Sequence, residues 1–167
     1  MVASTRDFSV SVEGIKGTYR PSEIYARNNI TQGKIPVVSC EGPCIRGEIA
    51  RLVANIVAEK VPSFARCCYA GAAFAPHSSM ARWVKQAERV ISIDGCPLKC
   101  HSRILQNLID DERRIEIDAL SFYDRYQDIF LYTEVPQAER EAVARELADG
   151  VIAALENEIG LPPPGGH

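Results

Sequence analysis

Two segments of the chain repeat one order of features: an apolar run, a turn that carries two cysteines, and a helical pattern of apolar residues. The segments are VVSCEGPCIRGEIARLVANIV at residues 37–57 and VISIDGCPLKCHSRILQNLI at residues 90–109. Parallel strands must be joined by long crossovers, which are usually helices. The repeat therefore predicts two strand–turn–helix units of one parallel sheet. Both cysteine turns would then lie at the carboxyl edge, where such sheets bind ligands.

The rest of the chain also alternates strand and helix patterns. Short β-branched apolar runs are typical of strands buried on both faces, and apolar residues at helical spacing predict helices. Strands are predicted at residues 35–39, 64–74, 90–93 and 114–120, with a short edge strand at 8–12. Helices are predicted from residue 45 until Pro62, at 78–88, at 98–110 and after Pro136. Residues 19–34 are predicted as a loop or short helix. This order predicts an α/β fold, a Rossmann-like three-layer sandwich with a mostly parallel sheet of about four to five strands.

The length of 167 residues is that of one domain with a core of its own. We expect residues 1–34 to form a partly ordered N-terminal extension and residues 35–160 to form a single α/β metal-binding domain. Residues 161–167 are mostly proline and glycine, and we expect them to be a flexible tail.

The composition excludes several classes of partner. The net charge of -3 lacks the basic excess that nucleic-acid binding requires. No apolar run reaches the roughly 18 residues that span a bilayer, and the N-terminus does not have the pattern of a secretory signal. We therefore expect a cytoplasmic protein that binds neither nucleic acid nor membranes. Because thiols stay reduced in that compartment, its six cysteines are expected to be metal ligands or reactive thiols rather than disulfides.

The two cysteine turns share one spacing. Cys40 and Cys44 are separated by three residues, and so are Cys96 and Cys100. Each pair closes a strand and opens a helix, where the exposed N–H groups and the helix dipole stabilise a thiolate. Thiolates bind soft metals, and four of them suit a tetrahedral site for Zn²⁺ or an iron–sulfur cluster. Each turn also contains glycine and proline, which allow a tight turn.

Three functions are compatible with these turns. The first is a zinc protein with a structural, handling or sensing role, the second an iron–sulfur protein for electron transfer or sulfur chemistry, and the third a metal-free thiol enzyme for redox or sulfur transfer. A single cysteine at a strand end would be ordinary core, but the matched pair favours metal or thiol chemistry. Neither turn has a phosphate-binding glycine pattern, and no acid–base or nucleophile–base pair predicts catalytic residues.

Five further residues are candidates for this edge or its surroundings. Cys67 and Cys68 would point to opposite faces of a strand, so we expect Cys67 to be core and Cys68 to be an extra ligand or a reactive thiol toward a small-molecule or redox partner. Asp94 is expected to cap the turn. His101 is expected to face solvent, because it lies one step along a helix from Cys100. His77 is a weaker candidate for a ligand or proton carrier.

The same residues carry a family resemblance. Asp94-Gly95-Cys96, the turn SCEGPC with Gly47 after it, the segment Cys68-Tyr-Ala-Gly71 and the turn IDGCPLKC resemble the DGC-domain family of zinc-binding proteins, over about residues 37–120. The resemblance implies that Cys40, Cys44, Cys96 and Cys100 chelate the metal, that this metal is zinc, and that Cys68 matches another recurrent cysteine. The vicinal Cys67 departs from the family pattern, and residues 1–34 and the closing helix lie outside the resemblance.

Overall fold

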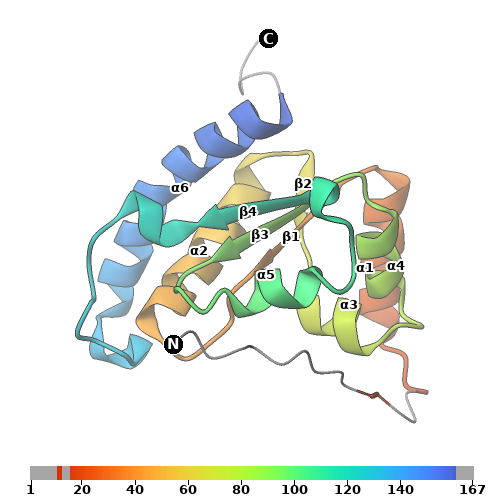
Figure 1. Cartoon of the computed structure of the whole chain (residues 1–167), viewed down its shortest axis with the longest axis horizontal. Helices are drawn as coiled ribbons and strands as arrows, with labels where there is room; N and C mark the ends of the chain where they lie inside the picture. The colour runs from red at the N-terminus through yellow and green to blue at the C-terminus, as the bar shows by residue number, and fades with distance from the viewer. Residues whose placement is uncertain (1–10, 13–15, 161–167) are drawn as a thin grey trace, which may run out of the picture.

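The computed structural model describes residues 11–12 and 16–160 of the chain. Its centre is a sheet of four parallel strands in the order β2–β1–β3–β4 (Figure 1). The strands are β1 (Ile35–Ser39), β2 (Phe64–Arg66), β3 (Val90–Asp94) and β4 (Arg114–Asp118). The predicted α/β fold with a parallel sheet is confirmed.

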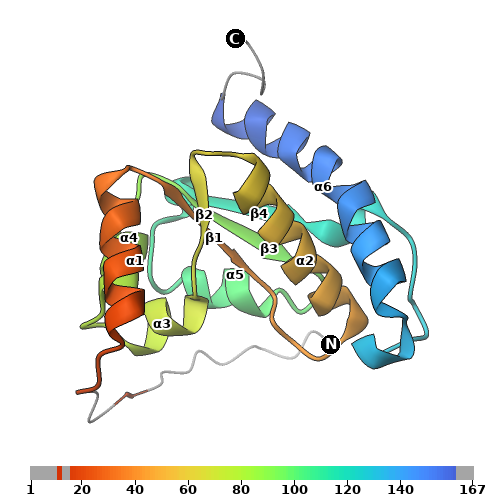
Figure 2. The same cartoon turned by 180° about the vertical axis from the view of Figure 1, so that it is seen from behind.

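Helices cover both faces of this sheet and give the molecule three layers, as Figure 1 and Figure 2 show from opposite sides. One face is covered by α2 (Ile45–Lys60) and α6 (Gln137–Ile159), and the other by α1 (Arg20–Thr31), α3 (Tyr69–Phe74), α4 (Ser79–Gln86) and α5 (Cys100–Leu105). Three short 3-10 segments, Asp111–Arg113, Ala119–Phe122 and Tyr132–Glu134, lie in the connections around β4 and before α6.

Neighbouring residues of β1 belong to two separate cores. Val37 packs into the cluster under α2 and α6, and Val38 packs into the cluster under α1, α3, α4 and α5. This division follows from the alternation of side chains along a strand. Because both faces are covered, β1 and β3 are buried on both sides, and β3 also carries the buried polar residues Ser92 and Asp94.

The second strand is shorter than predicted. Only Phe64–Arg66 is strand, and Tyr69–Phe74 forms α3, so the prediction of a strand over 64–74 is wrong in its second half. The small residues of α3 lack the β-branched side chains that favour strands. Cys68 opens the helix instead, because its sulfur accepts the N–H of Gly71 at 3.3 Å.

Other predicted boundaries have mixed outcomes. The helix predicted at 98–110 is confined to Cys100–Leu105, because a turn with Lys99 in the left-handed region precedes it. The helix predicted at 78–88 is present as α4 with Ser78 as its N-cap, and the start of the last helix after Pro136 is confirmed. Of the predicted edge strand, residues 8–10 lie outside the described residues, as does the predicted tail at 161–167, and residues 11–12 form no strand. No helix in the described part of the chain is long and apolar enough to cross a membrane.

Candidate metal centre

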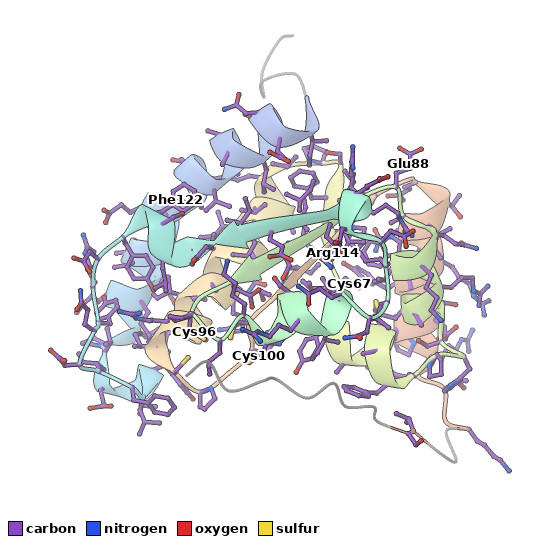
Figure 3. All side chains as sticks on the ribbon, in the orientation of Figure 1. Cys67, Glu88, Cys96, Cys100, Arg114 and Phe122 are labelled. Carbon is purple, nitrogen blue, oxygen red and sulfur yellow. The ribbon has the colours of Figure 1, made fainter. Side chains whose placement is uncertain are left out.

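The two central strands bring both cysteine turns to one edge of the sheet. Cys40 directly follows β1, and its N–H donates to the carbonyl oxygen of Ile93 in β3 at 3.1 Å. Cys96 lies in the turn after β3, and Cys100 is the first residue of α5. Figure 3 shows Cys96 and Cys100 at this end of the sheet. The shared edge that the sequence predicts is therefore present.

The sulfurs of Cys40 and Cys44 converge over Gly47, in the first turn of α2. A Cβ atom at position 47 would lie 2.9 Å from the Sγ of Cys40 and 3.1 Å from the Sγ of Cys44. Cys44 is the N-cap of α2, and its sulfur accepts the N–H of Gly47 at 3.2 Å. Because Gly47 has no side chain, both sulfurs can lie next to its Cα.

At Gly95 the second cysteine turn packs directly against α2, the helix that follows the first cysteine turn. A Cβ atom at position 95 would lie 2.0 Å from the carbonyl oxygen of Arg46 and 3.0 Å from the Cβ of Ala50. Both neighbours belong to α2, and the oxygen belongs to the backbone, which cannot swing aside as a flexible side chain can. Only glycine allows the Asp94-Gly95-Cys96 turn to approach α2 this closely.

The electrostatic surroundings of Cys40 suit a cation. Burial is the main cause that raises the pKa of the Cys40 thiol to about 11; the nearby carboxylate of Asp94 acts in the same direction, and a hydrogen bond from the backbone of Gly42 acts against it. A bound cation would oppose the effects of burial and of Asp94, because positive charge favours the thiolate.

Asp94 connects the second cysteine turn to the start of α5. Its side chain is buried and accepts hydrogen bonds from the N–H of Ser102 at 3.3 Å, from the hydroxyl of Ser102, and from the hydroxyl of Ser92 at 3.4 Å. Burial opposes the charged form, but the nearby His101 and the bonds from Ser102 outweigh it and lower the pKa of Asp94. The predicted capping role is confirmed, since Ser102 lies in the first turn of α5.

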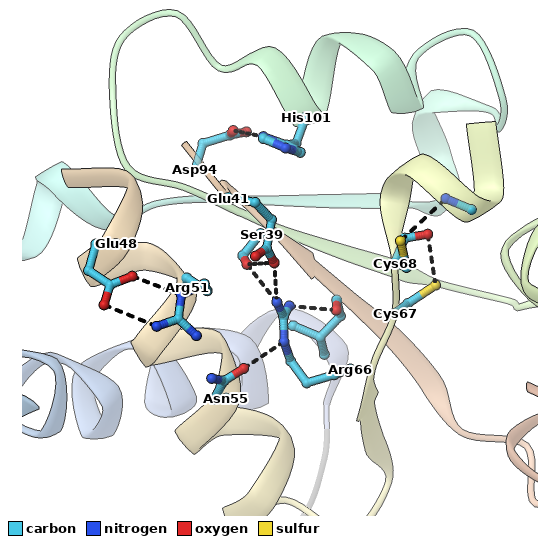
Figure 4. Close-up of polar contacts among 12 residues, drawn as sticks. Ser39, Glu41, Glu48, Arg51, Asn55, Arg66, Cys67, Cys68, Asp94 and His101 are labelled. Carbon is cyan, nitrogen blue, oxygen red and sulfur yellow. Dashed lines mark hydrogen bonds and ion pairs between the residues drawn. The ribbon is translucent and has the colours of Figure 1, made fainter. Parts of the chain in front are cut away.

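His101 is buried, so the prediction that it faces solvent is wrong. Its ring packs edge-on against Tyr69, with ring centroids 3.9 Å apart, and its Nδ1 lies 3.7 Å from the Oδ1 of Asp94 (Figure 4). The reason is that α3 packs against α5 and covers its first turn. Neither ring nitrogen of His101 has a hydrogen-bond partner among the described residues.

The vicinal cysteines divide as expected, but for a different reason. Cys67 is core: it is buried with its sulfur 3.4 Å from the sulfur of Met80, and burial raises the pKa of its thiol. Cys68 is exposed and caps α3. Neither residue lies on a strand, so the end of β2 and the start of α3 separate the two side chains, rather than strand alternation.

The remaining predicted residues do not join a common ligand group. Cys100 is exposed at the start of α5, and His77 is exposed with its Nε2 2.9 Å from the carbonyl oxygen of Gly17. Within residues 11–12 and 16–160, no three His, Cys, Asp or Glu side chains lie close enough to hold a metal ion. The structure therefore brings Cys40 and Cys44 together and leaves Cys96 and Cys100 beside them without closing a site.

Sequence reasoning missed Tyr69 as a neighbour of the cysteines. Burial raises the pKa of its hydroxyl. Tyr69 is the first residue of α3, and its ring packs against His101, the residue after Cys100. Its position directly after Cys68 is the signal that could have indicated it.

Sequence reasoning also missed Arg66, which ties the first turn to β2. Its guanidinium donates to the carbonyl oxygen of Val37 at 2.9 Å, to the hydroxyl of Ser39 at 2.8 Å and to the carboxylate of Glu41 at 2.6 Å (Figure 4). Its Nε also donates to Asn55 at 2.9 Å. Glu41 lies inside the SCEGPC turn, so this fork fixes the turn against the edge of the sheet.

Comparison with known families gives a match over the cysteine turns. Residues 36–147 match the family model described as the DGC domain, a span that contains both cysteine turns, α3 and the start of α6. No curated protein and no solved structure gives a match.

Proposed function

The chain belongs to the DGC-domain family, whose model matches well over half of its length, and from this membership we propose that it binds zinc through the thiolates of Cys40, Cys44, Cys96 and Cys100. Family membership supports a metal-binding role in general. Four thiolates form a closed tetrahedral site, which suits metal handling or sensing in a reducing compartment such as the cytoplasm.

The observation that carries this proposal is the convergence of two sulfurs over Gly47. A Cβ atom at position 47 would lie 2.9 Å and 3.1 Å from the two sulfurs, so a side chain there would displace them from this arrangement. Cys40 is buried, with a pKa raised to about 11, which is costly for a lone thiol that must ionise. Zn²⁺ would supply the positive charge that makes this thiolate favourable.

The other two ligands would come from the second turn. Gly95 holds this turn against α2, and the carbonyl oxygen of Arg46 leaves no space for a larger residue. Cys96 is half-buried and Cys100 is exposed, so neither sulfur is committed to the core. Cys68, exposed at the start of α3, is the candidate for an additional ligand or a reactive thiol, toward a small-molecule or redox partner.

The test is anaerobic purification followed by a visible spectrum and elemental analysis for zinc, iron and acid-labile sulfide. We expect a colourless protein with zinc equimolar to the chain. The Cys40→Ser and Cys96→Ser variants should lose this zinc. Cys67→Ala is the matched control, because Cys67 is buried against Met80 rather than at the metal edge, and it should keep the zinc.

Each other result has a definite meaning. Full zinc content in Cys96→Ser would show that the ligand set is wrong. A brown protein with iron and sulfide would indicate that the site holds an iron–sulfur cluster instead of zinc. Cys68 would then be tested as an additional ligand of the cluster. A protein without either metal would leave the metal-free thiol enzyme as the function of this edge.

A further inference from the structure

Cys40 and Cys44 are arranged as a reactive pair as well as a pair of ligands. Both sulfurs lie close to one point over Gly47, and both also lie near Gly42, whose Cβ would be 3.8 Å from the Sγ of Cys40 and 4.0 Å from that of Cys44. Glycine at both positions leaves no side chain of residue 42 or 47 between the two sulfurs.

We propose that Cys40 and Cys44 form an intramolecular disulfide when the chain holds no metal. This inference rests on the proposed function only in that bound zinc would protect the same two sulfurs. It adds a modification at this site: oxidation by a low-molecular-weight disulfide, such as an oxidised thiol of the glutathione class.

The other cysteines are less suited to pair. Cys67 is buried against Met80, where a small oxidant cannot reach its sulfur. Cys68 and Cys100 lie at the starts of two different helices, α3 and α5. Cys96 belongs to the other turn, whereas Cys40 and Cys44 lie in one turn and both of their sulfurs lie next to Gly47.

The chemistry balances with one oxidant. Cys44 is half-buried and is the more accessible of the two, so its thiolate attacks the small disulfide and releases one equivalent of the reduced thiol. Cys40 then loses its proton to solvent, and its sulfur attacks the Sγ of Cys44 and releases the second equivalent. Two thiols of the protein are oxidised by two electrons, and one small disulfide is reduced to two thiols.

Metal binding and oxidation at Cys40 and Cys44 would therefore exclude one another. A disulfide has no thiolate to offer, so the oxidised chain loses two of its four proposed ligands at once. Reduction of the disulfide restores both. Metal content at this edge would then depend on the redox state of the surroundings, which is a property suited to a sensor.

Mass spectrometry of tryptic peptides tests the proposal, because the cysteines fall into separate peptides. Residues 35–46 contain Cys40 and Cys44 together, residues 67–82 contain Cys67 and Cys68, residues 90–99 contain Cys96, and residues 100–103 contain Cys100. The full chain is treated with a chelator, exposed to oxidised glutathione, alkylated and digested. We expect most of the peptide 35–46 to be unalkylated and about 2 Da lighter than its reduced form, since a disulfide removes two hydrogens.

The outcomes separate this proposal from the proposed function. Alkylation of both cysteines in 35–46, or a link between 35–46 and 90–99, would overturn the disulfide. A chain that never binds metal but forms the disulfide would overturn only the zinc proposal. A Cys44→Ser variant should leave Cys40 open to alkylation or mixed-disulfide formation, and a Cys68→Ser variant should oxidise at 35–46 as the wild type does.

Discussion

Gly95 and Arg46 are in direct backbone contact: a Cβ atom at position 95 would lie 2.0 Å from the carbonyl oxygen of Arg46. This contact joins the turn after β3 to the first turn of α2. Cys44 directly precedes α2, and Cys96 directly follows Gly95, so the distance between the two cysteine turns depends on a position where only glycine fits. The central glycine of the Asp94-Gly95-Cys96 motif is thus a packing requirement of the edge that carries the cysteine turns.

We expect Gly95→Ala to destabilise the chain strongly, because the neighbour is a backbone atom that cannot move aside. The overpacking should lower the free energy of unfolding by about 2 kcal/mol or more. Urea unfolding followed by circular dichroism measures the effect. The control is Gly17→Ala, where an added Cβ has nothing within 4 Å, and its free energy of unfolding should stay within about 0.5 kcal/mol of the wild type.

At Gly47 we expect metal binding to suffer more than stability. The atoms that a Cβ would meet, at 2.9 Å and 3.1 Å, are the two sulfurs, which can rotate away. Gly47→Ala should therefore fold but lose most of its zinc, as measured by elemental analysis and competition with a chelator. Gly42→Ala is the matched control, because its Cβ would be in ordinary contact with the same sulfurs at 3.8 Å and 4.0 Å. Equal zinc content in both variants would contradict the role of Gly47.

The sheet could be predicted from sequence because its central strands have a strong signal. Ile35–Ser39 and Val90–Asp94 are short runs rich in β-branched apolar residues, which are typical of strands buried in a parallel sheet, although Val90–Asp94 also contains the buried polar residues Ser92 and Asp94. The α3 helix could not be predicted in the same way. Its N-cap is a cysteine, whereas serine, threonine, aspartate and asparagine are the residues that usually mark a helix start.

The site was predictable to the level of its edge and no further. The repeated spacing places Cys40, Cys44 and the second turn at one end of the sheet, because parallel strands end together. The burial of His101 depends on α3, whose Tyr69 ring covers it, and this contact joins two segments far apart in the chain. Helical periodicity within α5 alone carries no information about that cover.

His101 should contribute to stability, because it fills buried space between Tyr69 and the carboxylate of Asp94. His101→Ala leaves a cavity and removes a polar neighbour of Asp94, and we expect the free energy of unfolding of the metal-free chain to fall by about 2 kcal/mol. Chemical denaturation measures the loss. His77→Ala serves as the control, since His77 is exposed, and a loss of similar size there would contradict the assignment.

Lys99 has a left-handed backbone, with φ of 47°, at the position before α5. Glycine adopts this region without a steric penalty, whereas a β-branched residue is strongly disfavoured there. Lys99→Gly should leave stability unchanged or raise it by up to about 1 kcal/mol, because the ion pair with Asp118 at 3.9 Å is partly exposed and contributes little. Lys99→Val should be less stable than both, and thermal unfolding of the three proteins ranks them. A valine variant as stable as the glycine variant would contradict the strain.

Glu23 links α1 to the first turn of α4 and should make stability depend on pH. Its carboxylate accepts the hydroxyl of Ser79 at 2.5 Å and the N–H of Ser79 at 2.9 Å, and these bonds lower its pKa below the ordinary value of 4.5. A carboxyl group whose pKa is lower in the folded state stabilises the fold above the unfolded value and loses this contribution as the pH falls through the folded value. Glu23→Gln should therefore be less stable than the wild type at about pH 7, and the gap should narrow as the pH falls below 4.5, as measured by urea unfolding across this range. Glu59→Gln, at an exposed position of α2, is the control, and its difference in stability from the wild type should not change with pH in this way. A stability difference for Glu23→Gln that is the same at every pH would mean that the charge of Glu23 does not act through Ser79.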